Sequence, residues 1–249
     1  MSVESERDLI GLRRAGRIVA LALDAMRRAV RPGLTTADLD AVGAAVFARH
    51  GARSAPQLVY DFPGTNCISL NEEAVHGVPS ETRLIMRGDL VKIDVTAELD
   101  GYMADACATV EVDSWTPAKQ RLIRTATVAL RRGLAAARAG APVTAIGAAV
   151  EQVVSRRGYE IIPQLGGHGI GRVIHEAPSV PNFADPGNRD LLTRGLVLTV
   201  EPIIAAGIGR VGRPGPDGWT LPTQDGSLSA HVEHTVVVTA GAPLVLTRL

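Results

Sequence analysis

The sequence predicts an α/β protein of the α+β type, in which helices cover a central antiparallel sheet. The first observation is an internal repeat: residues 31–51 align without a gap on residues 138–158, at an offset of 107 positions. The second is that the same offset places residues 87–94 on 194–201, so that an apolar strand is expected to end in a carboxylate, Asp94 or Glu201, in both halves. Similarity of this length indicates a repeated unit.

Each repeat predicts two helices followed by strands. The helices expected in the first half are Ser5 to Val30 and Thr36 to His50, and those in the second half are Pro117 to Ala139 and Thr144 to Arg157. Alanine-rich helices can resemble one another by chance, but the shared offset continues through the carboxylate-ended strands and argues against that alternative. We therefore expect one domain, 1–249, whose halves at about 5–115 and 117–240 are related by a pseudo-twofold axis.

A hairpin is predicted between Asp94 and Asp105, because Asp100-Gly101 is a type I′ turn signal. If these two are the central turn residues, Thr96 faces Asp105 and Asp94 faces Cys107. Diagonal neighbours on one face lie about 7–8 Å apart, so the two aspartates can converge on ions between them. The alternative, a strand-end cap at Asp94 and a solvated edge residue at Asp105, conflicts with the apolar strand before Asp94, since buried carboxylates need compensating charge.

A glycine-rich turn, residues 166–171, surrounds His168 and precedes His175. Glycines let the backbone adopt positive φ and approach neighbours closely, as a rigid ligand-bearing loop requires. Similar patterns occur in nucleotide-binding folds, but neither a phosphate-loop lysine nor the Rossmann spacing accompanies this one. A catalytic loop with two histidines is therefore expected.

Further acidic and imidazole side chains lie at strand ends and in a loop. Glu201 precedes Pro202, which suits a strand end, and Glu233 comes just before a run of valines. The alternative for Glu233 is a surface strand position between solvated histidines. His76 precedes a glycine in a loop, where imidazoles often bind or relay protons. A solvated or structural role is expected of the other histidines, His50, His231 and His234.

The composition limits the partners of the protein. Lys plus Arg and Asp plus Glu number 26 each, so no net field draws the chain to nucleic acid or to a membrane. Two cysteines cannot build a disulfide framework, and no apolar run or leader opens the chain. We expect a cytoplasmic protein with a small or locally recognised partner.

Together these features predict a metal centre. Carboxylates with one imidazole suit a pair of divalent cations, which bridging carboxylates hold about 3.5–4 Å apart in two-metal hydrolases. Such a site accepts Co, Mn, Fe or Zn. The predicted ligands are Asp94, Asp105, His168, Glu201 and Glu233.

At these residues the chain resembles the type I methionine aminopeptidases of the pita-bread metallohydrolase fold, from about Ile10 to Val238. The motifs that carry the resemblance are Cys67 to Glu72 with His76 to Pro79, Ile93 to Thr96, Gly166 to Arg172, His175-Glu176, Val200 to Pro202, Asp217 to Thr220 and Glu233 to Thr235.

The resemblance implies a role for each residue. Asp94, Asp105 and Glu233 would chelate or bridge two metals, while His168 and Glu201 would complete the shell of one. A bridging hydroxide would be the nucleophile. His175 would donate to the carbonyl oxygen, Glu201 would carry the proton to the leaving amine, and His76 would bond the scissile amide nitrogen.

The resemblance also implies a methionine pocket, formed by Phe62, Cys67 and Trp219. Ile174 stands where the family usually has an aromatic residue. Two more departures are Val59-Tyr60-Asp61, in place of Tyr-His-Gly, and Ala106 in place of a small hydroxyl residue.

The substrate class follows from the same resemblance. We expect a monomer that removes the initiator methionine from nascent chains with a small second residue, and any ribosome contact would use the catalytic domain itself. One rival function is a proline-directed peptidase of the same fold. Another is a binding module that has lost catalysis.

Overall fold

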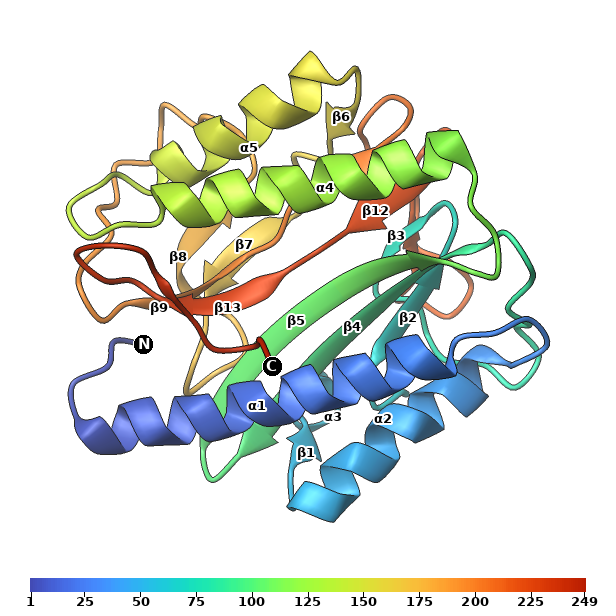
Figure 1. Ribbon diagram of the computed structural model, residues 1–249, viewed down its shortest axis with the longest axis horizontal. Coiled ribbons are helices and arrows are strands. Elements are labelled where there is room, and N and C mark those ends of the chain that lie inside the picture. Colours follow the sequence, from blue (N-terminus) through green and yellow to red (C-terminus); the bar gives the residue numbers. More distant parts are fainter.

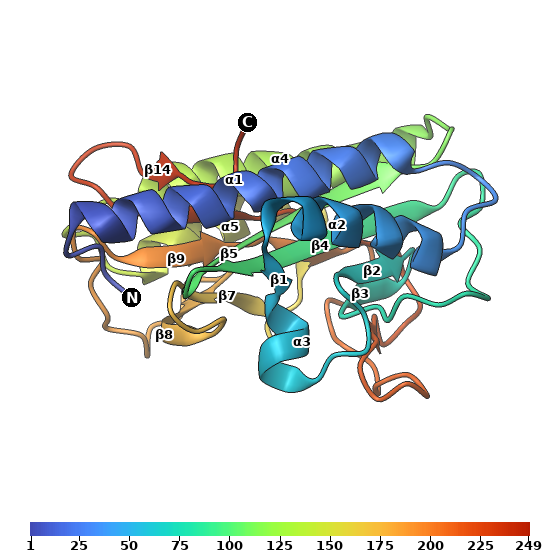
Figure 2. The same ribbon diagram turned by 90° about the horizontal axis from the view of Figure 1, so that it is seen from below.

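Long helices cover one face of the antiparallel sheets in the computed structural model, which describes residues 1–249. Figure 1 shows α1 and α2 over one half of the strands and α4 and α5 over the other, and Figure 2 shows these helices on one side with α3, β3, β7 and β8 on the opposite side. The helices are α1 (Glu6–Ala29), α2 (Thr36–His50), α3 (Ala55–Tyr60), α4 (Pro117–Ala136) and α5 (Thr144–Arg156).

The four long helices begin and end close to the predicted residues, which confirms that part of the sequence analysis. Local capping explains the ends of α2. The Thr35 side chain accepts from the Asp38 amide while the Asp38 carboxylate accepts from the Thr35 amide, and Gly51 ends the helix at φ +68°. This capping box satisfies backbone donors that the first turn leaves unpaired.

The strands form two main sheets and two small ones, all with antiparallel pairing. The first sheet contains β1 (Arg53–Ser54), β2 (Cys67–Leu70), β4 (Leu90–Leu99) and β5 (Tyr102–Glu111). The second contains β7 (Gly166–Gly169), β8 (Glu176–Pro181), β9 (Val197–Val200), β13 (His234–Val237) and β14 (Leu244–Val245). The small sheets contain β3 (Glu73–Val75) with β11 (Leu221–Pro222), and β6 (Glu160–Ile161) with β10 (Ile203–Ala205) and β12 (Ser229–His231).

The β4–β5 hairpin has the predicted register, with Asp94 opposite Cys107 and Thr96 opposite Asp105. Its turn residue Asp100 has φ +52°, and Gly101 follows at φ +80°, as a type I′ turn requires. One expectation is wrong. Strand β4 continues five residues beyond Asp94, so that only the second of the two repeated strands, β9, stops next to its carboxylate.

The core has two main parts, one beneath each helix pair. A cluster of 29 buried residues lies between α1, α2 and the β4–β5 sheet, and a cluster of 21 lies between α4, α5 and the strands of the second half. Val197 and Val237 of the second half belong to the first cluster, so the two halves share one interior. No helix is both long and apolar enough to cross a bilayer.

Candidate metal centre and peptide pocket

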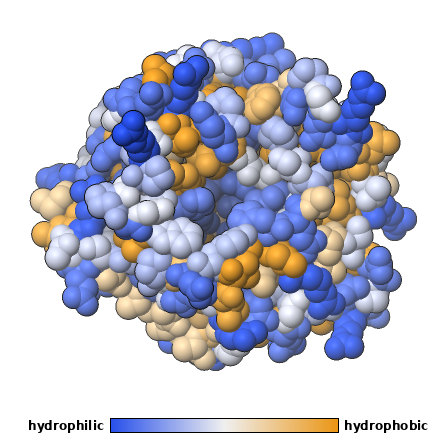
Figure 3. All heavy atoms as spheres, turned by 180° about the vertical axis from the view of Figure 1, so that it is seen from behind, coloured by the Kyte–Doolittle hydropathy of each residue, from blue (hydrophilic) through white to orange (hydrophobic).

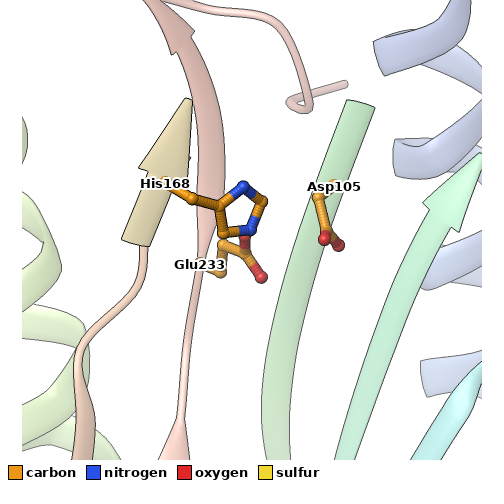
Figure 4. Close-up of side chains that lie close together, drawn as sticks. All are labelled: Asp105, His168 and Glu233. Carbon is orange, nitrogen blue, oxygen red and sulfur yellow. The ribbon is translucent and has the colours of Figure 1, made fainter. Parts of the chain in front are cut away.

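A pocket of about 360 Å³ lies among the strands, and all eleven predicted site residues line it. It opens on the face away from the long helices, which is hollowed near its centre in the space-filling view (Figure 3). The predicted ligands reach the pocket from β4, β5, β7, the end of β9 and the junction of β12 with β13. Figure 4 shows Asp105, His168 and Glu233 directed toward one another.

Two overlapping groups of donor atoms are close enough to share a cation. Asp105, His168 and Glu233 each offer one ligand atom within 4.8 Å of the others, and Glu201, His231 and Glu233 do the same. His168 Nε2 lies 3.5 Å from Glu201 Oε1, which joins the groups. Asp94 lies beside them on β4 as a diagonal neighbour of Asp105.

Side chains and backbone tie β5 to the segment that carries His231 and Glu233. The Asp105 amide donates to Thr235 Oγ1 at 2.8 Å, and that hydroxyl donates back to the Asp105 carbonyl at 2.7 Å. Thr109 makes the same exchange with the backbone of His231, at 2.9 and 2.7 Å. Between them the Glu233 amide donates to the Cys107 carbonyl at 2.9 Å. These bonds fix ligands from both halves of the chain in one register.

Burial and mutual repulsion disfavour charge on these carboxyl groups. Burial raises the pKa of Asp105 to about 7, with a further contribution from nearby Glu201. Burial also raises the pKa of Glu201 to about 7, although the imidazole of His168 opposes the shift. Burial, followed by neighbouring carboxylates, holds the pKa values of Asp94 and Glu233 well above their ordinary range. Bound positive charge would relieve this repulsion.

Unpartnered buried atoms also point to a cation. Of five buried side-chain polar atoms without a hydrogen-bond partner, four lie here: Asp94 Oδ1, Asp105 Oδ1, His231 Nε2 and Glu233 Oε1. A buried polar atom without a hydrogen-bond partner lowers the stability of the folded protein. Several carboxylate oxygens with imidazole nitrogen are a suitable donor set for divalent transition metals. The residues present therefore fit a divalent metal centre.

Of the two roles expected for His231, solvated or structural, its burial excludes the first. His50 is exposed and His234 Nδ1 hydrogen-bonds Thr247 Oγ1 at 2.9 Å, so these two are solvated and structural respectively. His231 is only 2% exposed and lies among the acidic groups, with Nε2 3.5 Å from Glu201 and 3.6 Å from Glu233. Its two-residue spacing from Glu233 was the available signal, because alternate residues of an extended segment share a face.

Two other imidazoles stand at the wall of the pocket. The rings of His168 and His175 have centroids 4.2 Å apart. His76, with φ +58°, lines the same pocket from the loop after β3. Both His76 and His175 are exposed by solvent-accessible area, yet the surrounding protein atoms desolvate their rings and lower the pKa of each to about 4. Both are therefore neutral near pH 7.

Tyr60, one of the departures from the family pattern, is a neighbour of His175. Its hydroxyl lies 2.5 Å from His175 Nδ1, and the two rings have centroids 5.6 Å apart. The two residues are 115 positions apart in the sequence, and no local sequence pattern indicates the contact.

Apolar side chains form a slot beside the acidic cluster, which consists of Asp94, Asp105, Glu201 and Glu233. Phe62 and Trp219 pack edge to face with ring centroids 5.3 Å apart. Ile174 is 3% exposed on the same pocket wall, and Cys67 pairs across the β2–β4 ladder with Asp94. The slot therefore reaches the carboxylates directly.

Comparisons with known proteins identify relatives along the whole chain. The profile of metallopeptidase family M24 matches residues 11–240. Methionine aminopeptidase 2 of Bacillus subtilis is 42% identical over 250 residues, covering 100% of both chains. The solved methionine aminopeptidases of Rickettsia prowazekii and Thermotoga maritima superpose with TM-scores of 0.94 and 0.96, at 36% and 31% identity. The alignments cover 99% and 100% of this chain and 100% of each of theirs, which confirms the expected pita-bread fold.

Prolidase from Pyrococcus furiosus shares the fold more distantly. It has a TM-score of 0.78 and 22% identity, and the match covers 98% of this chain but 65% of the prolidase.

Proposed function

The chain belongs to metallopeptidase family M24, and we propose that it removes the N-terminal methionine of nascent proteins and peptides whose second residue is small. It is a metal-dependent aminopeptidase, as its family and its methionine aminopeptidase relatives indicate. The observation that carries the proposal is the junction of a buried acidic cluster with an apolar slot in one pocket. A methionine side chain in that slot would lie beside the groups that would act on its peptide bond.

Two divalent cations per chain would be held by Asp94, Asp105, His168, Glu201 and Glu233. When bound, such a pair of ions lowers the pKa of a coordinated water and polarises the scissile carbonyl. Co, Mn, Fe and Zn all suit these donors. The orphaned oxygens of Asp94, Asp105 and Glu233 support this assignment, because they have no other partner in the protein.

His175 would stabilise the carbonyl oxygen as negative charge develops on it. A neutral imidazole has a single N–H, and the contact between Tyr60 and His175 Nδ1 leaves Nε2 free to carry that proton and donate it. His76 would hydrogen-bond the scissile amide nitrogen from the opposite loop. These roles need two neutral imidazoles, which the lowered pKa of both partly desolvated rings supports.

Glu201 would move the proton from the attacking water to the leaving amine. Its Oε1 accepts from Thr199 Oγ1 at 2.8 Å, which holds the carboxylate in place beside the ligands. A carboxylate held at this position can accept a proton from the water and return it to the leaving amine.

The apolar slot would bind the methionine side chain. Phe62, Cys67, Ile174 and Trp219 offer rings and sulfur to an unbranched thioether, which makes favourable contacts with aromatic edges. Ile174 replaces an aromatic side chain of the family pattern, and its aliphatic side chain keeps that wall of the slot apolar.

We also propose where and in what form the protein acts. Both of its cysteines are free and buried, as in proteins of the reducing cytoplasm. The ligands come from both halves of the chain, so one chain would act as a single catalytic domain and a monomer would suffice. Nascent chains leaving the ribosome would be its substrates, with no nucleic-acid or membrane binding of its own.

The test is release of free methionine from Met-Ala-Ser and Met-Leu-Ser by metal-stripped protein, with Mn, Fe(II), Co or Zn added back. Metal-dependent cleavage of the first peptide alone is the expected result. Cleavage of an X-Pro peptide instead would identify a proline-directed peptidase. No release with any metal, while the protein still binds the peptide, would identify a binding module.

A further inference from the structure

His231 is a buried imidazole that the proposed ligand set leaves without a function. It ends β12, and the exchange of hydrogen bonds between its backbone and Thr109 fixes its position. The side chain is directed into the acidic cluster, where Nε2 has no hydrogen-bond partner. A nitrogen that is buried and unpartnered at this point requires an explanation.

The distances around Nε2 suit shared coordination better than hydrogen bonding. Nε2 lies 3.5 Å from Glu201 Oε2 and 3.6 Å from Glu233 Oε2, whereas N–H···O bonds are usually about 2.7–3.2 Å long. Two ligand atoms each about 2.1 Å from one ion are separated by about 3.0–3.4 Å, depending on the angle between them. His168 Nε2 has the same 3.5 Å separation from the other oxygen of Glu201.

The two donor groups each contain one imidazole. His168 belongs to the group with Asp105, and His231 belongs to the group with Glu201, while Glu233 is common to both. We propose that His231 is a sixth metal-ligating side chain, which gives the pair of cations a second imidazole nitrogen. This inference rests on the metal centre of the proposed function.

A second nitrogen donor changes which metals the centre prefers. Oxygen-only shells suit Mn and Mg, whereas imidazole favours Fe, Co, Ni and Zn. We therefore expect the cation beside His231 to be retained more tightly when it is Co or Zn than when it is Mn.

The experiment compares three metal-free proteins loaded with Co(II): wild type, His231→Gln and His234→Gln. Glutamine keeps a polar side chain but is a poor ligand for these ions. His234 is the matched control, because it lies three residues away and bonds Thr247 rather than the cluster. Calorimetric titration gives the affinity of each equivalent, and X-ray absorption at two equivalents gives the number of imidazoles per cobalt.

Wild type and His234→Gln should show about one imidazole per cobalt, and His231→Gln about half that number. His231→Gln should also bind one of its two equivalents at least about tenfold more weakly. Circular dichroism checks that each variant is folded. Even if a variant does not fold, the number of imidazoles per cobalt in wild type decides whether His231 is a ligand.

About half an imidazole per cobalt in wild type, with two ions bound, would show that His168 is the sole imidazole ligand and overturn the proposal. In that case methionine release and the rest of the metal centre would stand. If wild type bound no cobalt, the proposed metal centre would fail together with this inference. A change in second-residue preference of His231→Gln with unaltered cobalt binding would assign His231 to the peptide instead.

Discussion

Removal of one hydroxyl group, in Tyr60→Phe, tests how His175 is held in its working state. The Tyr60 hydroxyl lies 2.5 Å from His175 Nδ1, and the phenylalanine ring can keep the ring contact at 5.6 Å between centroids. When the hydroxyl donates to Nδ1, the single proton of the neutral imidazole lies on Nε2. The substitution therefore leaves the packing intact, but the tautomer and the orientation of the His175 ring are no longer fixed by this hydrogen bond.

The expected loss follows from the strength and exposure of this bond. A hydrogen bond between neutral groups contributes about 0.5–1.5 kcal/mol net, and each 1.36 kcal/mol corresponds to about a tenfold change in rate. Tyr60 is 41% exposed, so water replaces part of what the hydroxyl supplies. We expect kcat to fall about two- to fivefold, with KM little changed, because charge on the carbonyl oxygen develops only in the transition state.

The assay is steady-state release of methionine from Met-Ala-Ser, with Tyr102→Phe as the matched control. The Tyr102 hydroxyl donates to Asp8 Oδ1 at 2.9 Å, on the first turn of α1 and away from the pocket, so its loss should leave kcat unchanged. A double-mutant cycle with His175→Ala provides the second measurement. If Tyr60 acts through His175, Tyr60→Phe should have no effect on rate in the His175→Ala background.

Two results would refute this reasoning. An unchanged kcat in Tyr60→Phe would show that the hydroxyl does not orient His175. An equal loss of kcat with and without His175 would show that Tyr60 acts on the substrate or on the fold.

Three further predictions concern stability and substrate binding. In metal-free protein the folded-state pKa values of Asp105 and Glu201, about 7, exceed their ordinary values of 3.8 and 4.5, so these two groups bind more protons in the folded state up to about pH 7, whereas four histidines with pKa values lowered to about 4 bind fewer below their ordinary value of 6.5. The Tm of metal-free protein should therefore fall by several degrees as pH rises from 6.5 to 8, above the range in which the imidazoles oppose the carboxyl groups, and recover when Zn is added at pH 8; a rising Tm would contradict this. Gly147→Ala in α5 should lower the free energy of unfolding in urea by about 1–3 kcal/mol, despite the better helix propensity of alanine, because its Cβ would lie 2.1 Å from the Phe183 carbonyl oxygen; a gain in stability would show that this segment shifts freely. Trp219→Ala should raise KM for Met-Ala-Ser about tenfold by removing one wall of the slot, and an unchanged KM would place the methionine side chain elsewhere.

Features set by local physics could be predicted from the sequence. Asp100-Gly101 fixed the hairpin register because only a turn with two positive φ angles matches the twist of its strands, and every partner on that face then follows. The helices could be predicted equally well, because capping residues such as Thr35 and Gly51 act within one turn of the helix. Strand β4 is longer than expected, and Val95, Ala97 and Leu99 continue its apolar alternation beyond Asp94.

Features set by long-range packing could not be predicted in this way. The partner of His175 comes from α3, and no pattern around Tyr60 indicates that its hydroxyl meets a ring 115 residues later. His231 lies in a polar segment with Glu233 and His234, and its two-residue spacing indicates a shared face with Glu233 but not that this face is buried. The bonds from Thr109 to the His231 backbone settle that point in the folded protein.

The repeated halves contribute different ligands because their equivalent strands end differently. In the first half β4 runs on through Asp94 into the hairpin, so the returning strand brings Asp105 to the same face. In the second half Pro202 has no N–H to continue the ladder, and Glu201 follows the last residue of β9 just before the chain enters β10. The acidic cluster is thus complete only when both halves are folded against each other. Since its buried carboxylates repel one another, metal binding and the docking of the halves should stabilise each other.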